Sequence, residues 1–252
     1  MSRYVISPQA TPAYSPANHT GTSNQRIISH ASVGARHVEV LIGTIVKGHG
    51  AQAHAHPTLE QASLILEGFG AGERDGVQVE VRTGEWLFNP IGSFHKFTTC
   101  SDRPVKVLVI YAPPYAENPE AAILYDEQSK AAGHLIGEGS HTLHTRQDMT
   151  FTPDHHDAGT VALPILSDKL GGSQHLTIFE QHTHPGKGAE QHALADTERV
   201  VIIRQGCLTG SIDGEAFEAS AGDWLFVPEG VHISYQATGD ATMQALVIQA
   251  HP

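Results

Sequence analysis

The chain has 252 residues, enough for one large domain or two of ordinary size, and 40% of them are hydrophobic, enough for packed cores. Its formal net charge of −12 argues against nucleic acid and anionic membrane surfaces as partners. The two cysteines suggest no disulfide framework, whereas 18 histidines favour metal chemistry. We therefore expect a cytoplasmic protein with no signal peptide and no membrane-spanning segment.

The N-terminal segment is rich in proline, serine, threonine and asparagine. This composition predicts an extended arm over residues 1–25, of the kind that can lie over a neighbouring subunit. The exposed edge strands of strand-rich domains also tend to be covered. Both features lead us to expect a homodimer.

Two strand-rich halves are predicted, at residues 26–117 and 158–252, from short β-branched segments bounded by turn residues. The dipeptide Asp75-Gly76 is a signal for a two-residue hairpin turn, and the same dipeptide recurs 138 positions later. A repeat of this length indicates two domains of the same fold.

The segment between the halves, residues 118–157, is predicted to be a linker with a short helix. Asn118 can cap a helix, Pro119 suits the first helical position, and Gly133 can end the helix. These signals predict a helix over residues 119–132. A polar, histidine-rich connector follows to about residue 157.

The most informative pattern consists of four side chains in the first half: His54, His56, Gln61 and His95. The first two share one face of a strand, because side chains alternate with period two. Glycines and prolines at fixed spacings allow the tight corners that bring the third and fourth alongside. Three neutral imidazoles and one amide oxygen suit a borderline divalent ion such as Zn, Fe, Mn, Ni or Co. Coordination by five or six groups would leave positions open for water or substrate.

This pattern resembles the two half-motifs of the cupin superfamily, G-x5-H-x-H-x(3,4)-E-x6-G and G-x5-P-x-G-x2-H-x3-N. The resemblance covers about 200 residues in two copies, so the chain resembles a bicupin. It implies an all-β fold with two tandem cupin domains, each a jelly-roll β-barrel with a pocket inside. It also implies that His54, His56 and His95 take the positions of the metal-binding histidines of that family.

The fourth ligand is less clear from the sequence. Counted back from Gly68, Gln61 rather than Glu60 stands where the family usually has glutamate. Adjacent strand residues face opposite ways, so only one of the two can face the metal, and we predict Gln61. The final asparagine of the second half-motif is replaced by Thr99.

The second half repeats the frame of the first but loses most of its ligands. His192 is retained, whereas Leu194 and Arg199 stand in the places of His56 and Gln61. An ungapped alignment sets His232 opposite Phe94 instead of His95, which turns the imidazole to the other face of its strand. We therefore expect no metal site in this half.

Other residues of both halves invite a hypothesis. His182 and His184 share a strand face and could join His192 in an unusual site, although a hydrogen-bonded or surface role is favoured. Arg199 could act as a carboxylate clamp. Trp86 and Trp224 recur in both halves and are predicted to belong to the structural framework. Phe97 is predicted to pack in the core or to line the pocket.

The leading hypothesis is a metal-dependent enzyme with its active site in the first half and one divalent ion, Zn, Mn, Fe or Ni, as cofactor. Its substrate would be a small oxygen-rich molecule such as a sugar acid, a keto acid or a ureido acid. The ion would act as a Lewis acid in lyase, isomerase or hydrolase chemistry. Neutral Gln61 in place of glutamate favours this use, because it leaves the ion more positive. Glu60, Ser63 or a metal-bound water could serve in proton transfer, and the sequence does not rank them.

Two alternatives remain open at this point. One is a metal-dependent dioxygenase, which is a common activity among bicupins. The other is a cupin that binds a small molecule without catalysis.

Overall fold

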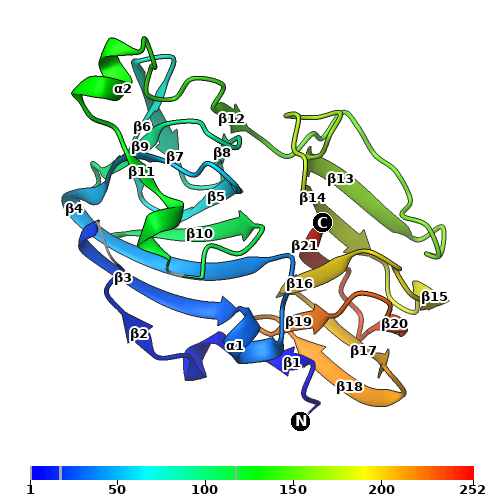
Figure 1. Cartoon of the computed structure of the whole chain (residues 1–252). Coiled ribbons are helices and arrows are strands. Elements are labelled where there is room, and N and C mark those ends of the chain that lie inside the picture. Colours follow the sequence, from blue (N-terminus) through cyan, green and yellow to red (C-terminus); the bar gives the residue numbers. More distant parts are fainter. Residues whose placement is uncertain (1, 17–18, 117) are drawn as a thin grey trace. The chain divides into compact units, whose positions relative to one another are not determined.

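The computed structural model describes residues 2–16, 19–116 and 118–252. They form an all-β fold in two compact units, each described below by itself (Figure 1). Residues 12–30 and 38–144 make up the N-terminal barrel; the C-terminal barrel consists of residues 2–11, 31–37 and 145–252. In these described parts, no helix has the length and apolar character that crossing a membrane would require.

The N-terminal barrel is built on one antiparallel sheet with the strand order β12-β8-β5-β10-β4-β9-β6-β7. Strands β3 and β11 also pair with β4, and β2 pairs with β3. The bounds are β2 Ala13–Tyr14, β3 His19–Ile28, β4 Glu39–Ala55, β5 Glu60–Glu67, β6 Phe69–Arg74, β7 Val77–Arg82, β8 Trp86–Asn89, β9 His95–Thr99, β10 Val105–Ala112, β11 Ile123–Leu124 and β12 His141–Leu143.

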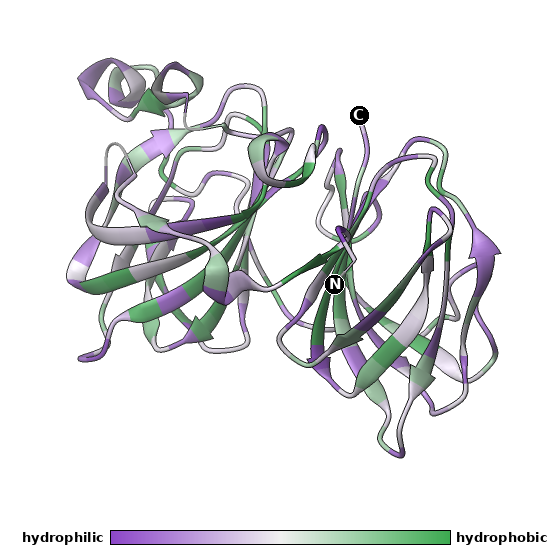
Figure 2. Ribbon diagram, turned by 90° about the horizontal axis from the view of Figure 1, so that it is seen from below, coloured by the Kyte–Doolittle hydropathy of each residue, from purple (hydrophilic) through white to green (hydrophobic). Residues whose placement is uncertain are grey.

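The C-terminal barrel has a six-stranded sheet, β1-β19-β16-β21-β14-β13, and a four-stranded sheet, β15-β20-β17-β18. The bounds are β1 Val5–Ile6, β13 Thr160–Leu166, β14 Leu176–Thr183, β15 Gly188–His192, β16 Glu198–Gln205, β17 Cys207–Ile212, β18 Glu215–Ser220, β19 Trp224–Val227, β20 Ile233–Thr238 and β21 Met243–Ala250. Two short elements, the 3-10 helix η1 (Pro8–Ala10) and the helix α1 (His30–Val33), precede β4. Figure 2 shows hydrophobic residues gathered on the strands of each barrel.

The sequence repeat is also a structural repeat. Strands β5 and β16 begin and end 138 positions apart, and the same holds for β6 and β17, β7 and β18, β8 and β19, and β10 and β21. His54 pairs with His95 in the N-terminal barrel, and His192 pairs with Ile233 in the C-terminal barrel. The ungapped alignment is therefore correct, and His232 does not occupy the position that corresponds to His95.

The segment expected to be an extended arm is paired with strands of its own chain. Strand β1 pairs with β19 in the C-terminal barrel, and β3 pairs with β4 in the N-terminal barrel. Residues 1 and 17–18 of the predicted arm lie outside the described residues. The polar composition predicted an arm because β3 has a partly exposed face with polar side chains. This segment is instead held as a strand by its backbone pairing with β4.

The predicted helix over residues 119–132 is wrong, although the linker does contain a short helix. A 3-10 turn, η2 (Pro119–Ala121), is followed by β11 and then by the helix α2 (Glu127–Ala131). Asp126 caps α2, since its side chain accepts hydrogen bonds from the backbone amides of Gln128 and Ser129. Between η2 and α2, the pairing of β11 with residues 54–55 of β4 outweighs the local helix signals.

The two recurring tryptophans belong to the framework, as predicted. Trp86 lies on β8 and Trp224 on β19, and both are buried. Neither is among the residues that line the cavity described in the next section. Phe97 has both of the roles considered for it, because it packs against the hydrophobic core and also lines that cavity.

Strands β6 and β9 approach each other closely at Gly70. A Cβ atom at this position would lie 2.6 Å from the carbonyl oxygen of Thr98 and 2.3 Å from the ring of Phe97. On the same strand, a Cβ atom at Gly72 would make only ordinary contacts, with the Leu87 side chain at 3.4 Å and the Lys96 carbonyl oxygen at 3.8 Å. We expect Gly70→Ala to lower the free energy of unfolding by about 1 to 3 kcal/mol and the matched control Gly72→Ala to change it by less than about 1 kcal/mol. Urea unfolding followed by tryptophan fluorescence measures both, and equal effects would contradict the close approach.

Candidate metal centre

Three histidines meet at one end of the N-terminal barrel. His54 lies at the end of β4, where the ladder with β9 shifts register, His56 directly follows that strand, and His95 begins β9. All three are buried, and one ring nitrogen of each lies within 4.8 Å of the others. The alternation of side chains along β4 puts His54 and His56 on the same face, as the sequence predicted. The structure thus brings together the three predicted histidine ligands.

The proton of each imidazole is placed by a backbone carbonyl. The Nδ1 atom of His54 lies 2.7 Å from the Gln52 carbonyl oxygen, and that of His95 lies 3.0 Å from the Ser93 carbonyl oxygen. The Nδ1 atom of His56 lies 3.2 Å from the carbonyl oxygen of Ala121. A carbonyl can only accept, so each Nδ1 carries the proton. Each Nε2 therefore keeps a free lone pair, which is the form that binds a metal ion.

The site keeps these imidazoles neutral. Burial away from water lowers the pKa of His54 to about 4 and also lowers the pKa of His56. The fully buried His95 has its pKa held well below the ordinary value, first by burial and then by the neighbouring histidines. Neutral imidazoles at neutral pH do not have to lose a proton before a metal ion binds.

Two polar atoms lack a suitable partner, and a cation would supply it. The Nε2 atom of His56 is the buried side-chain nitrogen without a hydrogen bond among the described residues. The Nε2 atom of His95 lies 3.1 Å from Oε1 of Gln61. A neutral imidazole has one proton, and His95 uses it on Ser93, so two acceptors face each other there. A bound cation would remove this repulsion, and the donor set therefore fits a divalent metal ion.

The structure places Gln61, and not Glu60, beside the histidines. Gln61 and Ser63 line a cavity next to the imidazoles, and Nε2 of Gln61 donates a hydrogen bond to Oγ of Ser63, at 3.1 Å. Glu60 is buried but does not line that cavity. Its counterpart Glu198 accepts hydrogen bonds from two backbone amides, those of residues 36 and 37, each at 2.8 Å. At the position equivalent to Glu60, the C-terminal barrel thus uses a carboxylate to hold the backbone.

The cavity beside the imidazoles has a volume of about 70 Å³. Besides apolar side chains and two of the imidazoles, it is lined by polar and charged groups from several strands, namely His19, Thr22, Asn24, Gln61, Ser63, Glu73, Asn89, Lys96 and Tyr111. Asn89 is held by the hydroxyl of Ser140, which donates to its Oδ1 at 2.9 Å. The sequence analysis did not identify His19, Asn89 or Tyr111. The alternation of β8 and β10 could have indicated the last two, because Asn89 ends one strand and Tyr111 lies on a cavity-facing position of the other.

Tyr115 closes the site over His56. The centres of the two rings lie 5.1 Å apart, with their planes at 62°. The buried carboxylate of Glu39 holds this segment, because it accepts hydrogen bonds from the Ala116 amide at 2.8 Å and from Arg26 at 3.1 Å. The carbonyl of Ala121, which fixes the proton of His56, belongs to the same linker segment. The linker is therefore part of the candidate site.

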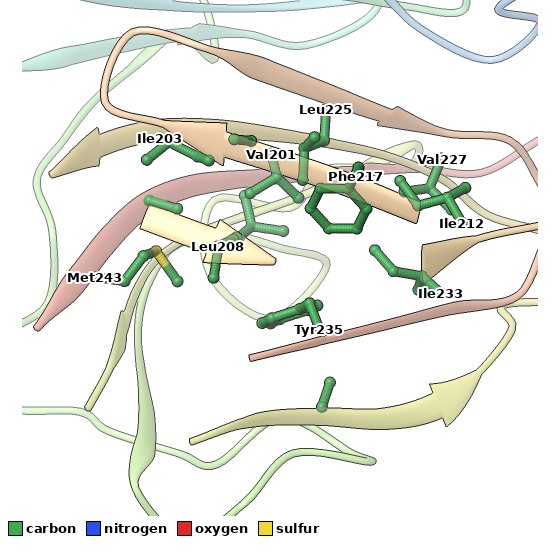
Figure 3. Close-up of a cluster of buried hydrophobic side chains, with 14 of the residues drawn as sticks. Val201, Ile203, Leu208, Ile212, Phe217, Leu225, Val227, Ile233, Tyr235 and Met243 are labelled. Atoms are coloured by element: carbon green, nitrogen blue, oxygen red, sulfur yellow. The ribbon is translucent and has the colours of Figure 1, made fainter. Parts of the chain in front are cut away.

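The C-terminal barrel has lost the metal-binding set. His192, Leu194, Arg199 and Ile233 occupy the four equivalent positions. Where the N-terminal barrel has Ser63 and Asn89, this barrel has Val201 and Val227, and both pack with Ile233 in its apolar core (Figure 3). Among the described residues, the three histidines of the N-terminal barrel form the one group arranged for metal binding, and His182 and His184 are not part of it.

Comparisons with known proteins agree with this description. Residues 41–111 match the family model of the cupin domain. An uncharacterized protein of Methanocaldococcus jannaschii is 35% identical over 63 residues, and the match spans 25% of this chain and half of that relative. Two solved structures resemble the whole fold. The protein Ylba from E. coli has a TM-score of 0.69 at 12% identity, with 98% of this chain and 89% of that chain covered. An oxalate decarboxylase from Lactobacillus farciminis, solved as a formate complex, has a TM-score of 0.70 at 14% identity, with coverages of 100% and 87%.

The first prediction from this geometry concerns metal content. Purification without added metal, followed by elemental analysis, is expected to give about one equivalent of a divalent ion per chain. The double variant His54→Ala, His56→Ala is expected to contain none, because two of the three imidazoles are lost. The matched control His155→Ala, His156→Ala alters two adjacent histidines of the C-terminal barrel and is expected to keep the ion. Two equivalents in the wild-type protein would show a second site and contradict the description above.

The second prediction concerns the metal-free protein at acidic pH. The pKa of His54 is about 4 in the folded protein and near 6.5 when unfolded, so between these values the unfolded chain binds the extra proton. The free energy of unfolding should therefore fall as the pH decreases from 6.5 to 4, by up to about 3 kcal/mol for this group. Urea unfolding in the presence of a chelator at several pH values measures the slope. His54→Gln should make it shallower, while the exposed control His144→Gln should leave it unchanged.

Proposed function

We propose that this chain, which belongs to the cupin superfamily and has the two-barrel fold of the bicupins, is a metal-dependent enzyme that acts on a small oxygen-rich acid in its N-terminal barrel. The observation that carries the proposal is the set of three buried, neutral imidazoles whose Nε2 lone pairs face one point, at the edge of a cavity with polar walls. His54, His56 and His95 would hold the ion, with Gln61 as the fourth ligand. When bound, the ion would polarise a carbonyl or carboxylate oxygen of the substrate.

The size of the cavity limits the substrate. One water molecule occupies roughly 10 to 15 Å³ of a cavity measured in this way. The cavity of about 70 Å³ therefore holds roughly five water-sized groups. This room suits a short keto acid or ureido acid better than an intact sugar acid. The oxalate decarboxylases that share the fold are named for an acid of this size, although their 14% identity supports only the fold.

The cavity is lined by the charged side chains of Glu73 and Lys96 and also by neutral hydrogen-bonding groups. Oγ of Ser63 accepts a hydrogen bond from Gln61, which leaves its own proton free to be donated to a substrate oxygen. Burial raises the pKa of Tyr111, so its hydroxyl stays protonated and can also donate. Asn89 keeps its amide nitrogen for the substrate, because its oxygen is occupied by Ser140. These three neutral groups can orient an acid by hydrogen bonds.

We propose Ser63 rather than Glu60 for proton transfer in this site. Ser63 lines the cavity beside Gln61, whereas Glu60 does not line it. A general acid or base must be within hydrogen-bond reach of the reacting group, which favours a residue that lines the cavity. Lyase, isomerase and hydrolase reactions all require such a proton transfer, and the site does not distinguish among them.

The third prediction tests catalysis directly. Metal-loaded protein is incubated with glyoxylate, pyruvate, oxalate and ureidoacetate under nitrogen and under air, and products are followed by proton NMR. We expect turnover of at least one acid at the same rate in both atmospheres. Ser63→Val, which installs the residue of the other barrel, should lower kcat by about a hundredfold. The control Ser211→Ala, on β17 of the C-terminal barrel, should leave kcat unchanged.

Two results would overturn the proposal. Oxygen consumption in proportion to product would identify a dioxygenase instead of a Lewis-acid enzyme. Binding of these acids by the metal-loaded protein without any product, in either atmosphere, would identify a cupin that binds small molecules without catalysis.

A further inference from the structure

The C-terminal barrel contains a buried positive charge without an acidic partner. Arg199, on β16, is only 7% exposed. Within the described part of the chain, its one recorded side-chain contact is with His192, where Nη1 lies 3.1 Å from Nε2. Its pKa is lowered, first by burial, and no carboxylate appears among the groups that act on it. Burial of an arginine away from water is costly unless a negative charge compensates it.

The groups around Arg199 are neutral and cannot supply that charge. The Nδ1 atom of His192 carries the proton and donates it in a hydrogen bond to the carbonyl oxygen of Glu190, at 2.8 Å. The Nε2 atom of His192 therefore accepts the hydrogen bond from Arg199. His156 has its pKa lowered by burial, and its Nε2 lies 2.6 Å from the hydroxyl of Tyr235. That hydroxyl accepts a hydrogen bond from Gln181, at 2.7 Å, and so donates its own proton to His156. The cluster thus holds one net positive charge.

The repeat shows that this charge is not needed to fill the barrel. Three polar positions of the N-terminal cavity became apolar in the C-terminal barrel, at Val201, Val227 and Ile233, and these side chains pack in the core. At the position of Gln61, however, the C-terminal barrel has an arginine instead of another apolar residue. Filling the interior explains the three valine and isoleucine residues but does not explain a cation.

The cluster is also open to solvent. His155 is exposed, and its ring stacks on that of His192 with the ring centres 4.9 Å apart and the planes at 13°. Arg199 presents five N–H donors in a planar fork, and only one of them is used on His192. A planar fork of this kind matches the two oxygens of a carboxylate, and the single positive charge matches a single negative one.

We propose that Arg199 of the C-terminal barrel, which donates to His192 beside the exposed ring of His155, binds the carboxylate group of a small organic acid. This second binding site is separate from the metal centre and contains no metal. The ligand is a monoanion with one exposed carboxylate, in contrast to phosphate, whose second charge finds no second cation here.

Isothermal titration calorimetry tests this site in the full-length double variant His54→Ala, His56→Ala, which removes binding at the metal centre. Sodium acetate, its neutral isostere acetamide, and inorganic phosphate are the probes. We expect acetate to bind to one site per chain and acetamide not to bind. Arg199→Gln, which installs the residue of the N-terminal barrel, should weaken acetate binding by about tenfold or more. The matched control Arg204→Gln lies on the same strand, pairs with Glu180 at the surface and should bind acetate as the parent does.

Several results would overturn the proposal. Acetate and acetamide binding equally, or acetate failing to bind at tens of millimolar, would show that the charge recruits no carboxylate. Unchanged binding to Arg199→Gln would place the site elsewhere, and preference for phosphate would refute the carboxylate assignment. If Arg199→Gln does not fold, Arg199→Lys serves in its place: it keeps the charge, loses the planar fork, and should bind acetate more weakly than the parent.

Discussion

The hydrogen bond from an imidazole Nδ1 to a backbone carbonyl is the interaction on which both barrels depend. At His54, His95 and His192, the carbonyl belongs to the residue two positions earlier, so the local turn of the chain sets the tautomer. His56 differs, because its partner, the carbonyl of Ala121, lies in the linker 65 positions away. The direction of the Nε2 lone pairs is thus decided by local chain geometry for all but one of these rings, and the linker supplies the remaining constraint.

The two barrels show how one backbone supports two interiors. Their equivalent strands keep an offset of 138 residues, so equivalent side chains face the same way, inward or outward. Replacement of Ser63, Asn89 and His95 by valine and isoleucine turns the wall of a cavity into a packed core. Burying each such side chain contributes roughly 1.5 to 3 kcal/mol. The N-terminal barrel forgoes this stabilisation where it keeps its polar cavity, as functional sites commonly do.

The sequence was sufficient for the features that depend on period and spacing. The all-β fold, the repeat, the three histidines and the choice of Gln61 over Glu60 as the cavity-facing residue all follow from counting positions along strands, and the structure agrees with them. Features that depend on pairing across the chain could not be obtained in this way. Strand β11 replaces the middle of a predicted helix because β4 is its partner, and Tyr115 reaches His56 because Glu39 holds the turn that follows. No local pattern encodes either contact.

The contrast between Gln61 and Arg199 gives a common electrostatic rule for the two barrels. In the N-terminal barrel, neutral ligands would leave the full charge of a divalent ion uncompensated. In the C-terminal barrel, a guanidinium takes the position of the amide, and its hydrogen bond satisfies the Nε2 atom of His192. A guanidinium stays charged at all physiological pH values and cannot dissociate from the protein, whereas a metal ion can. With an ion bound, the N-terminal barrel would combine neutral imidazoles with one cation, as the C-terminal barrel does with Arg199, in a protein whose formal net charge is −12. Because a net negative charge disfavours the approach of anions, local cations at these two positions would be what a small acid needs in order to bind.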